Sequence, residues 1–272
     1  MKYLVINADD FGLDSAVNAA VIQAHTTGIL TSTSLLVTGP AVDEAVALAR
    51  QHPRLGVGIH LCLVQGRSAL TGAEFPNSVL KITGNFEAEL RAQIEKFLAT
   101  GLRPTHLDSH MHTHMHPRVL PVVIRLAQEY RIRWVRAPHE PFRYSAGKLL
   151  VRLARWPIFT ALGRRAGRKL RAAGLQTPVR GVGVLHPGQL TENFLVQYLQ
   201  HLPEGVTEIF FHPATESNAA LHACQLGYQH ASELQALCSP VARKLIDECS
   251  IKLVNFSELA TDGTADRSVW AG

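Results

Sequence analysis

Several features that would place this 272-residue chain in a familiar class are missing. No run of about 18 apolar residues occurs, so the sequence predicts no transmembrane helix. The amino terminus lacks the apolar stretch and small-residue cleavage site of a signal peptide, which favours a cytoplasmic protein. The four cysteines show no CxxC spacing, and we therefore expect reduced thiols rather than a disulfide framework or a zinc knuckle.

Nucleotide-binding motifs are also absent. Neither GxGxxG after a predicted strand nor a GxxxxGKS or GxxxxGKT loop occurs, which argues against dinucleotide and P-loop sites. The net charge of +5 indicates an anionic partner, yet no DNA- or RNA-binding motif is present, and we expect no nucleic acid. The chain is 46% hydrophobic and 18% charged, which suffices for a full core.

Short apolar runs alternate with helical patterns along the chain. Predicted strands cover 3–6, 34–37, 55–63, 104–108, 133–136, 182–185, 208–212 and 252–255. Predicted helices cover 15–27, 41–51, 86–100, 118–130, 149–173, 192–200 and 233–248, the fifth interrupted at Pro157. A long loop is expected at 64–84. The alternation predicts an α/β fold with a parallel sheet, one domain over 1–260, and a loose tail at 261–272.

Asp9 and Asp10 directly follow the first predicted strand. In barrel-type α/β folds, active sites are built at the carboxyl ends of the strands. Two adjacent carboxylates are costly to bury unless a positive charge neutralises them, and a metal ion is the simplest source of that charge. The alternative interpretation is a helix N-cap, in which either aspartate caps a helix that begins near Leu13.

Further polar side chains fall at or near the ends of later predicted strands, namely His60, Asp108, His110, Arg136 and His212. If the strands are parallel, all of these side chains converge at one end of the barrel, where the carboxyl ends of the strands meet. One carboxylate and two imidazoles make a good site for a catalytic divalent cation. Taken singly, a histidine such as His60 is more often a hydrogen-bonded core residue, and the histidine run at 110–116 is more often a surface feature. The joint pattern favours a site.

Four segments resemble the motifs of a known family. They are Ala8-Asp9-Asp10-Phe11-Gly12-Leu13, Val57-Gly58-Ile59-His60-Leu61, Thr105-His106-Leu107-Asp108-Ser109-His110 and Phe211-His212-Pro213. These segments are similar to the successive motifs of YdjC-type carbohydrate deacetylases, which are relatives of the NodB-type polysaccharide deacetylases, and the resemblance covers most of residues 1–255. It implies a distorted (β/α) barrel that removes the acetyl group from N-acetylated sugars with one divalent metal ion.

Within that family, the chain is most similar to the members associated with hopanoid biosynthesis, which act on an N-acetylglucosaminyl hopanoid. This closer resemblance depends on residues 133–141 and on the stretch around 181–188. A chitooligosaccharide of the diacetylchitobiose type is the alternative substrate. A non-catalytic metal- or membrane-binding barrel is the alternative to an enzyme.

By this resemblance, the metal ligands would be Asp10, His60 and His110. Asp9 would be the general base, His212 the general acid, and Arg136 would pair with Asp9. Asp and two His suit several divalent ions, so the metal, Zn²⁺ or Mg²⁺ among others, stays open. NodB-type sites often use an HxxxH pair, and the spacings of His106, His110 and His114 leave the second and third ligands open, with His112 a further candidate.

The stretch from Gly147 to Arg171 contains many basic residues and no acidic one. It predicts two basic amphipathic helices on either side of Pro157, with Trp156 on the apolar face, which is typical of a membrane-surface element. The alternative is an ordinary outer helix that packs on the sheet. We expect an N-acetylated sugar or glycolipid substrate and peripheral contact with the inner membrane face through 147–171. The sequence leaves a homodimer open.

Overall fold

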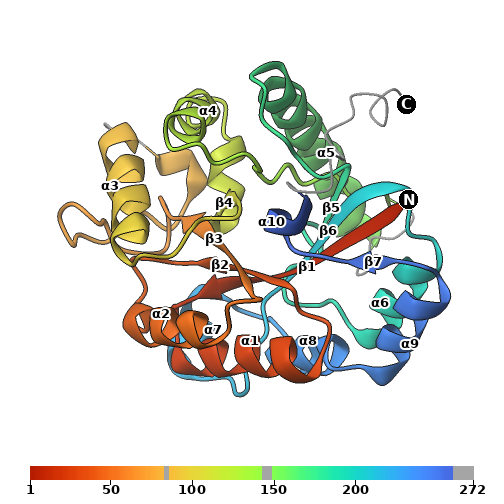
Figure 1. The fold of residues 1–272 in the computed structure, drawn as a ribbon. Helices are drawn as coiled ribbons and strands as arrows, with labels where there is room; N and C mark the ends of the chain where they lie inside the picture. The colour runs from red at the N-terminus through yellow and green to blue at the C-terminus, as the bar shows by residue number, and fades with distance from the viewer. Residues whose placement is uncertain (83–85, 143–148, 260–272) are drawn as a thin grey trace.

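A computed structural model describes residues 1–82, 86–142 and 149–259 (Figure 1). The predicted tail at 261–272 and the beginning of the basic stretch at 147–148 lie outside these residues. Among the described residues, no helix is both long enough and apolar enough to cross a membrane.

The centre of the fold is a seven-stranded sheet that curls into an open half-barrel (Figure 1). Its strands are β1 (Lys2–Phe11), β2 (Ser32–Leu35), β3 (Gly56–Leu61), β4 (Leu107–Ser109), β5 (Arg180–Val182), β6 (Gly205–Phe211) and β7 (Lys252–Leu253). Their order is β4-β3-β2-β1-β6-β5, and β7 pairs with β1. These strands pair in parallel, so their carboxyl ends meet at one edge. The predicted α/β fold of the distorted barrel type is confirmed.

Helices pack on both sides of the sheet. They are α1 (Ser15–Thr27), α2 (Val42–Gln51), α3 (Phe86–Ala99), α4 (Leu120–Glu129), α5 (Leu149–Ala172), α6 (Glu192–Gln200), α7 (Ala219–Cys224), α8 (His230–Leu237), α9 (Pro240–Glu248) and α10 (Phe256–Leu259), with 3₁₀ turns η1 (Val79–Lys81) and η2 (His110–Met115). Figure 1 shows α1, α2, α7 and α8 on one side of the sheet and α3, α4 and α5 on the other. The strands are buried almost throughout, as parallel strands covered on two faces must be.

Three predicted elements differ from the structure. The stretch 133–136 is joined to its neighbours only by isolated bridges, one of them between Leu107 and Val135. The predicted interruption at Pro157 is wrong, because α5 is continuous across it. A proline inside a helix costs about 3 kcal/mol, which the packing of buried α5 residues such as Ala166 and Leu170 offsets.

The predicted helix at 233–248 is two helices, α8 and α9. The division lies at Ser239, whose side chain accepts a hydrogen bond from the N–H of Ala242 and thereby starts a new helix. Pro240 follows at the first position of α9, where its missing N–H costs nothing. The short helix α7 was not predicted.

Candidate active site

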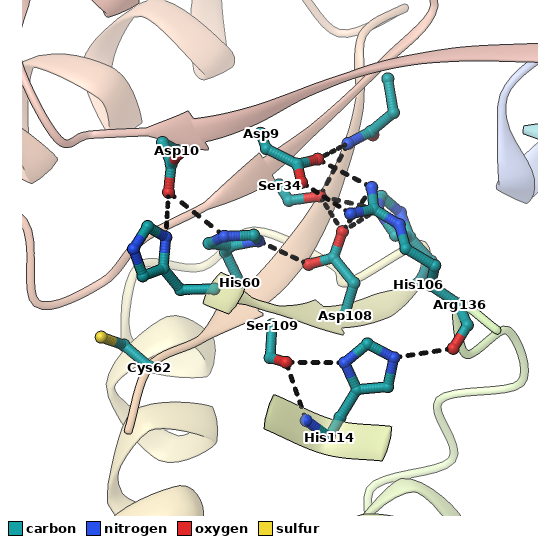
Figure 2. A network of polar contacts seen from close by, with 12 residues as sticks. Asp9, Asp10, Ser34, His60, Cys62, His106, Asp108, Ser109, His114 and Arg136 are labelled. Atoms are coloured by element: carbon teal, nitrogen blue, oxygen red, sulfur yellow. Dashed lines mark hydrogen bonds and ion pairs between the residues drawn. The ribbon is translucent and has the colours of Figure 1, made fainter. Parts of the chain in front are cut away.

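Asp9 and Asp10 lie near the end of β1 and are 2% and 1% exposed. The register between β1 and β2 shifts between Ala8 and Phe11, which marks a bulge at the pair. Asp10 has a φ of +65°, a left-handed conformation that residues other than glycine rarely adopt. This local strain directs the neighbouring carboxylates to different partners, Asp10 to His60 and Asp9 to Arg136 (Figure 2). The N-cap alternative is wrong, because Asp14 caps α1.

Asp10, His60 and His110 form a compact cluster of donor atoms. Oδ1 of Asp10 lies 3.2 Å from Nε2 of His60 and 3.0 Å from Nδ1 of His110. One ligand atom from each residue lies within 4.8 Å of the others. Burial would raise the pKa of Asp10, but the interactions with His110 and His60 outweigh it and hold that pKa well below its usual range. The cluster therefore offers an ionised carboxylate and two imidazoles.

His60 is fixed from behind by a second carboxylate (Figure 2). Its Nδ1 lies 2.7 Å from Oδ1 of Asp108, which directs Nε2 toward Asp10. Burial would lower the pKa of His60, but Asp108 and Asp10 raise it well above its ordinary value. A carboxylate behind a ligating histidine sets the tautomer and raises the basicity of the metal-binding nitrogen. These residues therefore fit a divalent cation.

Arg136 is fully buried and links the remaining carboxylates. Its two terminal nitrogens donate to both oxygens of Asp9 at 2.6 and 2.7 Å, a bidentate, charge-assisted pair. The same guanidinium contacts Asp108 at 2.7 Å and Glu208 at 2.8 Å. Burial would lower the pKa of Arg136, but these carboxylates raise it well above its usual value. Asp9 is thus held in one orientation by a permanent positive charge.

His212 follows β6 and reaches the same place. Its Nε2 lies 3.9 Å from Oδ2 of Asp9, and its ring packs edge-on against Tyr228 with 5.0 Å between centroids. Burial lowers the pKa of His212, although Asp9 opposes the shift. The structure therefore brings all six predicted site residues to one edge of the sheet, Asp9, Asp10, His60, His110, Arg136 and His212.

The alternative histidine ligands are engaged elsewhere. In His114, Nδ1 lies 2.6 Å from the hydroxyl of Ser109 and Nε2 lies 2.8 Å from the carbonyl oxygen of Arg136. Both ring nitrogens of His106 contact hydroxyl groups, Nε2 that of Ser34 and Nδ1 that of Thr105. Burial lowers the pKa of each ring to about 4. The ring of His112 packs against aromatic neighbours. The HxxxH spacings therefore do not form a pair of ligands here.

Several residues of the site received no role from the sequence. Asp108 and Glu208 both contact Arg136, and burial raises the pKa of Glu208 to about 7 against the opposing effect of that arginine. A glutamate inside an apolar strand was a signal that could have identified Glu208. Gln225 donates to Oδ2 of Asp10 at 2.6 Å. It follows α7, and no local pattern marks it.

A groove of about 770 Å³ opens beside the cluster. It is lined by loops that follow β1, β2 and β3, together with Cys224, and its volume is typical of small-molecule sites. Gln65 belongs to its wall, and Oε1 of Gln65 lies 3.4 Å from Nε2 of His110. Phe75 and Pro40 add apolar surface, and Thr38 and Asn77 add polar groups at the same wall. Through Gln65, one wall of the groove lies next to His110 of the donor cluster.

Comparison with curated proteins gives full-length matches. A carbohydrate deacetylase of Brevibacillus brevis is 35% identical over 269 residues, which is 94% of this chain and 99% of that protein. A carbohydrate deacetylase of Geobacillus stearothermophilus is 32% identical over 273 residues, with 94% and 98% of the two chains covered. The match is thus not confined to a single motif.

Solved structures agree with this result. A proposed cellobiose-phosphate cleavage protein from Enterococcus faecalis V583 superposes with a TM-score of 0.73 at 29% identity, covering 95% of this chain and 98% of that one. An uncharacterized protein from Agrobacterium tumefaciens C58 gives a TM-score of 0.55 at 13% identity, which concerns the fold alone. The family model described as YdjC-like protein matches residues 3–248. With nearly the whole chain matched by that model and by full-length relatives, this protein belongs to the YdjC-like family.

Proposed function

We propose that this protein is a metal-dependent carbohydrate deacetylase that hydrolyses the N-acetyl group of an N-acetylglucosamine-type sugar. The observation that carries the proposal is the cluster of Asp10, His60 and His110 beside the pair of Asp9 and Arg136. The full-length relatives are carbohydrate deacetylases, and the chain is accordingly a hydrolase that acts on a C–N amide bond.

Asp10, His60 and His110 would hold one divalent cation. The donor set of one carboxylate and two imidazoles suits Zn²⁺ better than Mg²⁺, which prefers oxygen ligands. Such a cation, when bound, would polarise the amide carbonyl and lower the pKa of a water molecule to roughly 7. Asp108 keeps His60 in the tautomer that can bind the cation.

Asp9 and His212 carry the proton transfers. Asp9 accepts the proton of the water that attacks the acetyl carbon, and Arg136 keeps its carboxylate oriented for this step. An amide nitrogen cannot leave as an anion, so His212 protonates the departing sugar amine. Each such transfer is typically worth ~10²–10⁴ in rate. The distance of 3.9 Å between Nε2 of His212 and Oδ2 of Asp9 supports the proposal that both act on one reacting group.

The finer substrate proposal is an N-acetylglucosaminyl hopanoid, supported by the resemblance of residues 133–141 and 181–188 to hopanoid-associated members. Diacetylchitobiose-type oligosaccharides are the alternative. The groove beside His110 supports a substrate that extends beyond one N-acetyl group, because its volume of about 770 Å³ exceeds the needs of an acetyl moiety. Its mixed polar and apolar wall suits a sugar.

A hopanoid substrate would be dissolved in the membrane, and we therefore also propose that α5 makes peripheral contact with the membrane surface. Exposed cations lie on the second half of this helix, Arg164, Arg165, Arg168 and Lys169, and the sequence has no acidic residue between Glu140 and Glu192. Leu153 and Ile158 on the first half are 51% and 60% exposed. If α5 lies parallel to the surface of a bilayer, the exposed cations of its second half and the exposed apolar residues of its first half can both contact the membrane. Trp156 instead packs inward on a small apolar cluster.

The test of the proposed function is acetate release by the purified protein. N-acetylglucosaminyl hopanoid and diacetylchitobiose are supplied separately, and products are identified by mass spectrometry. Acetate release that a chelator abolishes and a divalent ion restores is the expected result. Failure to release acetate from either substrate, with metal bound at one ion per chain, would contradict the proposal.

A further inference from the structure

The imidazole of His212 lacks an anchor at Nδ1. This nitrogen is buried and makes no hydrogen bond within the part of the chain that the structure describes. The side chain is only 10% exposed, and its Nε2 faces Asp9. A catalytic group must be held within roughly 0.5 Å of its productive position by its surroundings. For His212, that restraint comes from its backbone and from the ring beside it.

Two side chains of α8 hold both backbone polar groups of His212. Oε2 of Glu233 accepts the N–H of His212 at 2.5 Å, and Nδ1 of His230 lies 2.7 Å from its carbonyl oxygen. Because a carbonyl oxygen can only accept, Nδ1 of His230 carries the proton. Glu233 and His230 are three positions apart and therefore lie on one face of the helix. Side chains of a single helix thus bind both the N–H and the carbonyl oxygen of His212.

The second oxygen of Glu233 reaches another loop at the mouth. Oε1 accepts the N–H of Leu190 at 2.8 Å. Gly188 in that loop has a φ of +73°, and a Cβ atom there would lie 2.1 Å from the ring of Tyr228. The same ring packs against His212. Glu233 is fully buried, and its two oxygens accept the backbone N–H groups of Leu190 and His212.

We propose that Glu233 and His230 are positioning residues for the general acid, acting through the backbone of His212, and that Glu233 couples this acid to the loop at 188–190. The inference rests on the proposed role of His212 in the deacetylase reaction. The contacts go to backbone groups rather than to the donor cluster. Loss of either side chain therefore affects proton transfer and not the binding of the cation.

The first test uses a matched pair of variants. His230→Ala removes the donor to the His212 carbonyl, and His230→Asn keeps an amide nitrogen near the place of Nδ1. We expect kcat for acetate release to fall roughly 10- to 100-fold in His230→Ala and in Glu233→Gln, and to stay close to the wild-type value in His230→Asn. KM and the metal content stay unchanged. Wild-type kcat in His230→Ala, or an equal loss in His230→Asn, would overturn the inference.

The second test combines Glu233→Gln with His212→Ala. If Glu233 acts through His212, its substitution costs no further kcat once the acid is removed. An undiminished further loss would overturn the inference. Wild-type kcat in His212→Ala alone would instead remove the proposed role of His212, so the two failures are distinguishable.

A control variant separates positioning from general destabilisation. Asn255 is a buried residue near the amino-terminal ends of the strands, and its Oδ1 accepts the N–H of Ser257 at 2.9 Å. Asn255→Ala should lower the melting temperature and leave kcat unchanged. A loss of kcat in this variant equal to that in Glu233→Gln would assign the effect to destabilisation and overturn the inference.

Discussion

Asp108 stands between His60 and Arg136, with one carboxylate oxygen 2.7 Å from the imidazole and the other 2.7 Å from the guanidinium. The cluster proposed to bind the cation and the proposed general base are therefore joined through a single buried side chain. The same guanidinium also binds Asp9, so the orientations of His60 and of Asp9 depend on one network.

The first prediction concerns this bridge. Asp108→Asn removes the charge that holds the proton on Nδ1 of His60, and we expect metal affinity to fall about 10- to 100-fold. Competition with a chromophoric chelator measures the affinity. Glu208→Gln is the matched control, because Glu208 contacts Arg136 and, among the contacts of the described residues, makes none with His60. The metal affinity of this variant should equal that of the wild type.

The second prediction concerns the ligands. Asp10→Asn, His60→Ala and His110→Ala should each abolish bound metal and acetate release while circular dichroism shows an intact fold. His114→Ala should retain the metal, because both nitrogens of His114 are bonded elsewhere. Full occupancy by elemental analysis in His110→Ala would move the third ligand to another residue.

The third prediction separates proton transfer from metal binding. Asp9→Asn and His212→Ala should retain the metal and lose ~10²–10⁴ in kcat, because each removes a transfer made only in the transition state. Steady-state kinetics with metal analysis of the same samples provides the measurement. A variant with wild-type kcat would exclude that residue from the mechanism.

Much of this site could be predicted because polar residues interrupt apolar strands at recognisable places. Asp10 and His60 each stand at the end of a buried run, and a parallel sheet gathers such ends at one edge. Arg136 illustrates how an imperfect strand prediction can still place a residue at this edge of the sheet. Its stretch forms only isolated bridges, yet its N–H donates to the carbonyl of Leu107 at 3.0 Å, which aligns it with β4.

The remaining contacts could not be predicted from local patterns. Gln225 and Glu233 lie 13 and 21 positions beyond His212, and they reach the site only because α7 and α8 fold back over the end of β6. The bulge at Asp10 is likewise a property of the pairing between β1 and β2. Helical periodicity reports which face of a helix is buried and carries no information on the loop that the helix will meet.

The fourth prediction concerns α5. If its exposed cations contact an anionic bilayer, the wild type should co-sediment with anionic liposomes at low salt and dissociate at high salt, with roughly 1 kcal/mol of attraction for each cation near the surface. Changing Arg164, Arg165, Arg168 and Lys169 together to Gln should weaken binding and slow turnover of a lipid-borne sugar. Turnover of a short soluble N-acetyl sugar should be unaffected. Equal losses on both substrates would leave α5 a scaffold helix.

The last prediction concerns Glu233 and pH. Burial raises its pKa to about 8 from a reference value of 4.5, despite hydrogen bonds from the backbone of His212 and Leu190. Between these values the native state holds more protons than the unfolded chain, so the free energy of unfolding falls as pH rises, by up to ~1.4 kcal/mol per pH unit. Glu233→Gln is neutral in both states and should lose this slope.

Urea unfolding of wild type and Glu233→Gln from pH ~5 to ~8 measures the difference. All other ionisable groups are common to both proteins, so the difference isolates Glu233. The variant should gain stability relative to the wild type as pH rises, while its kcat is reduced. A residue that served only the fold would show the opposite combination, a loss of stability with unchanged kcat. Parallel pH slopes would show that Glu233 is ionised in the native state, and the carboxylate would then be held by its backbone donors alone.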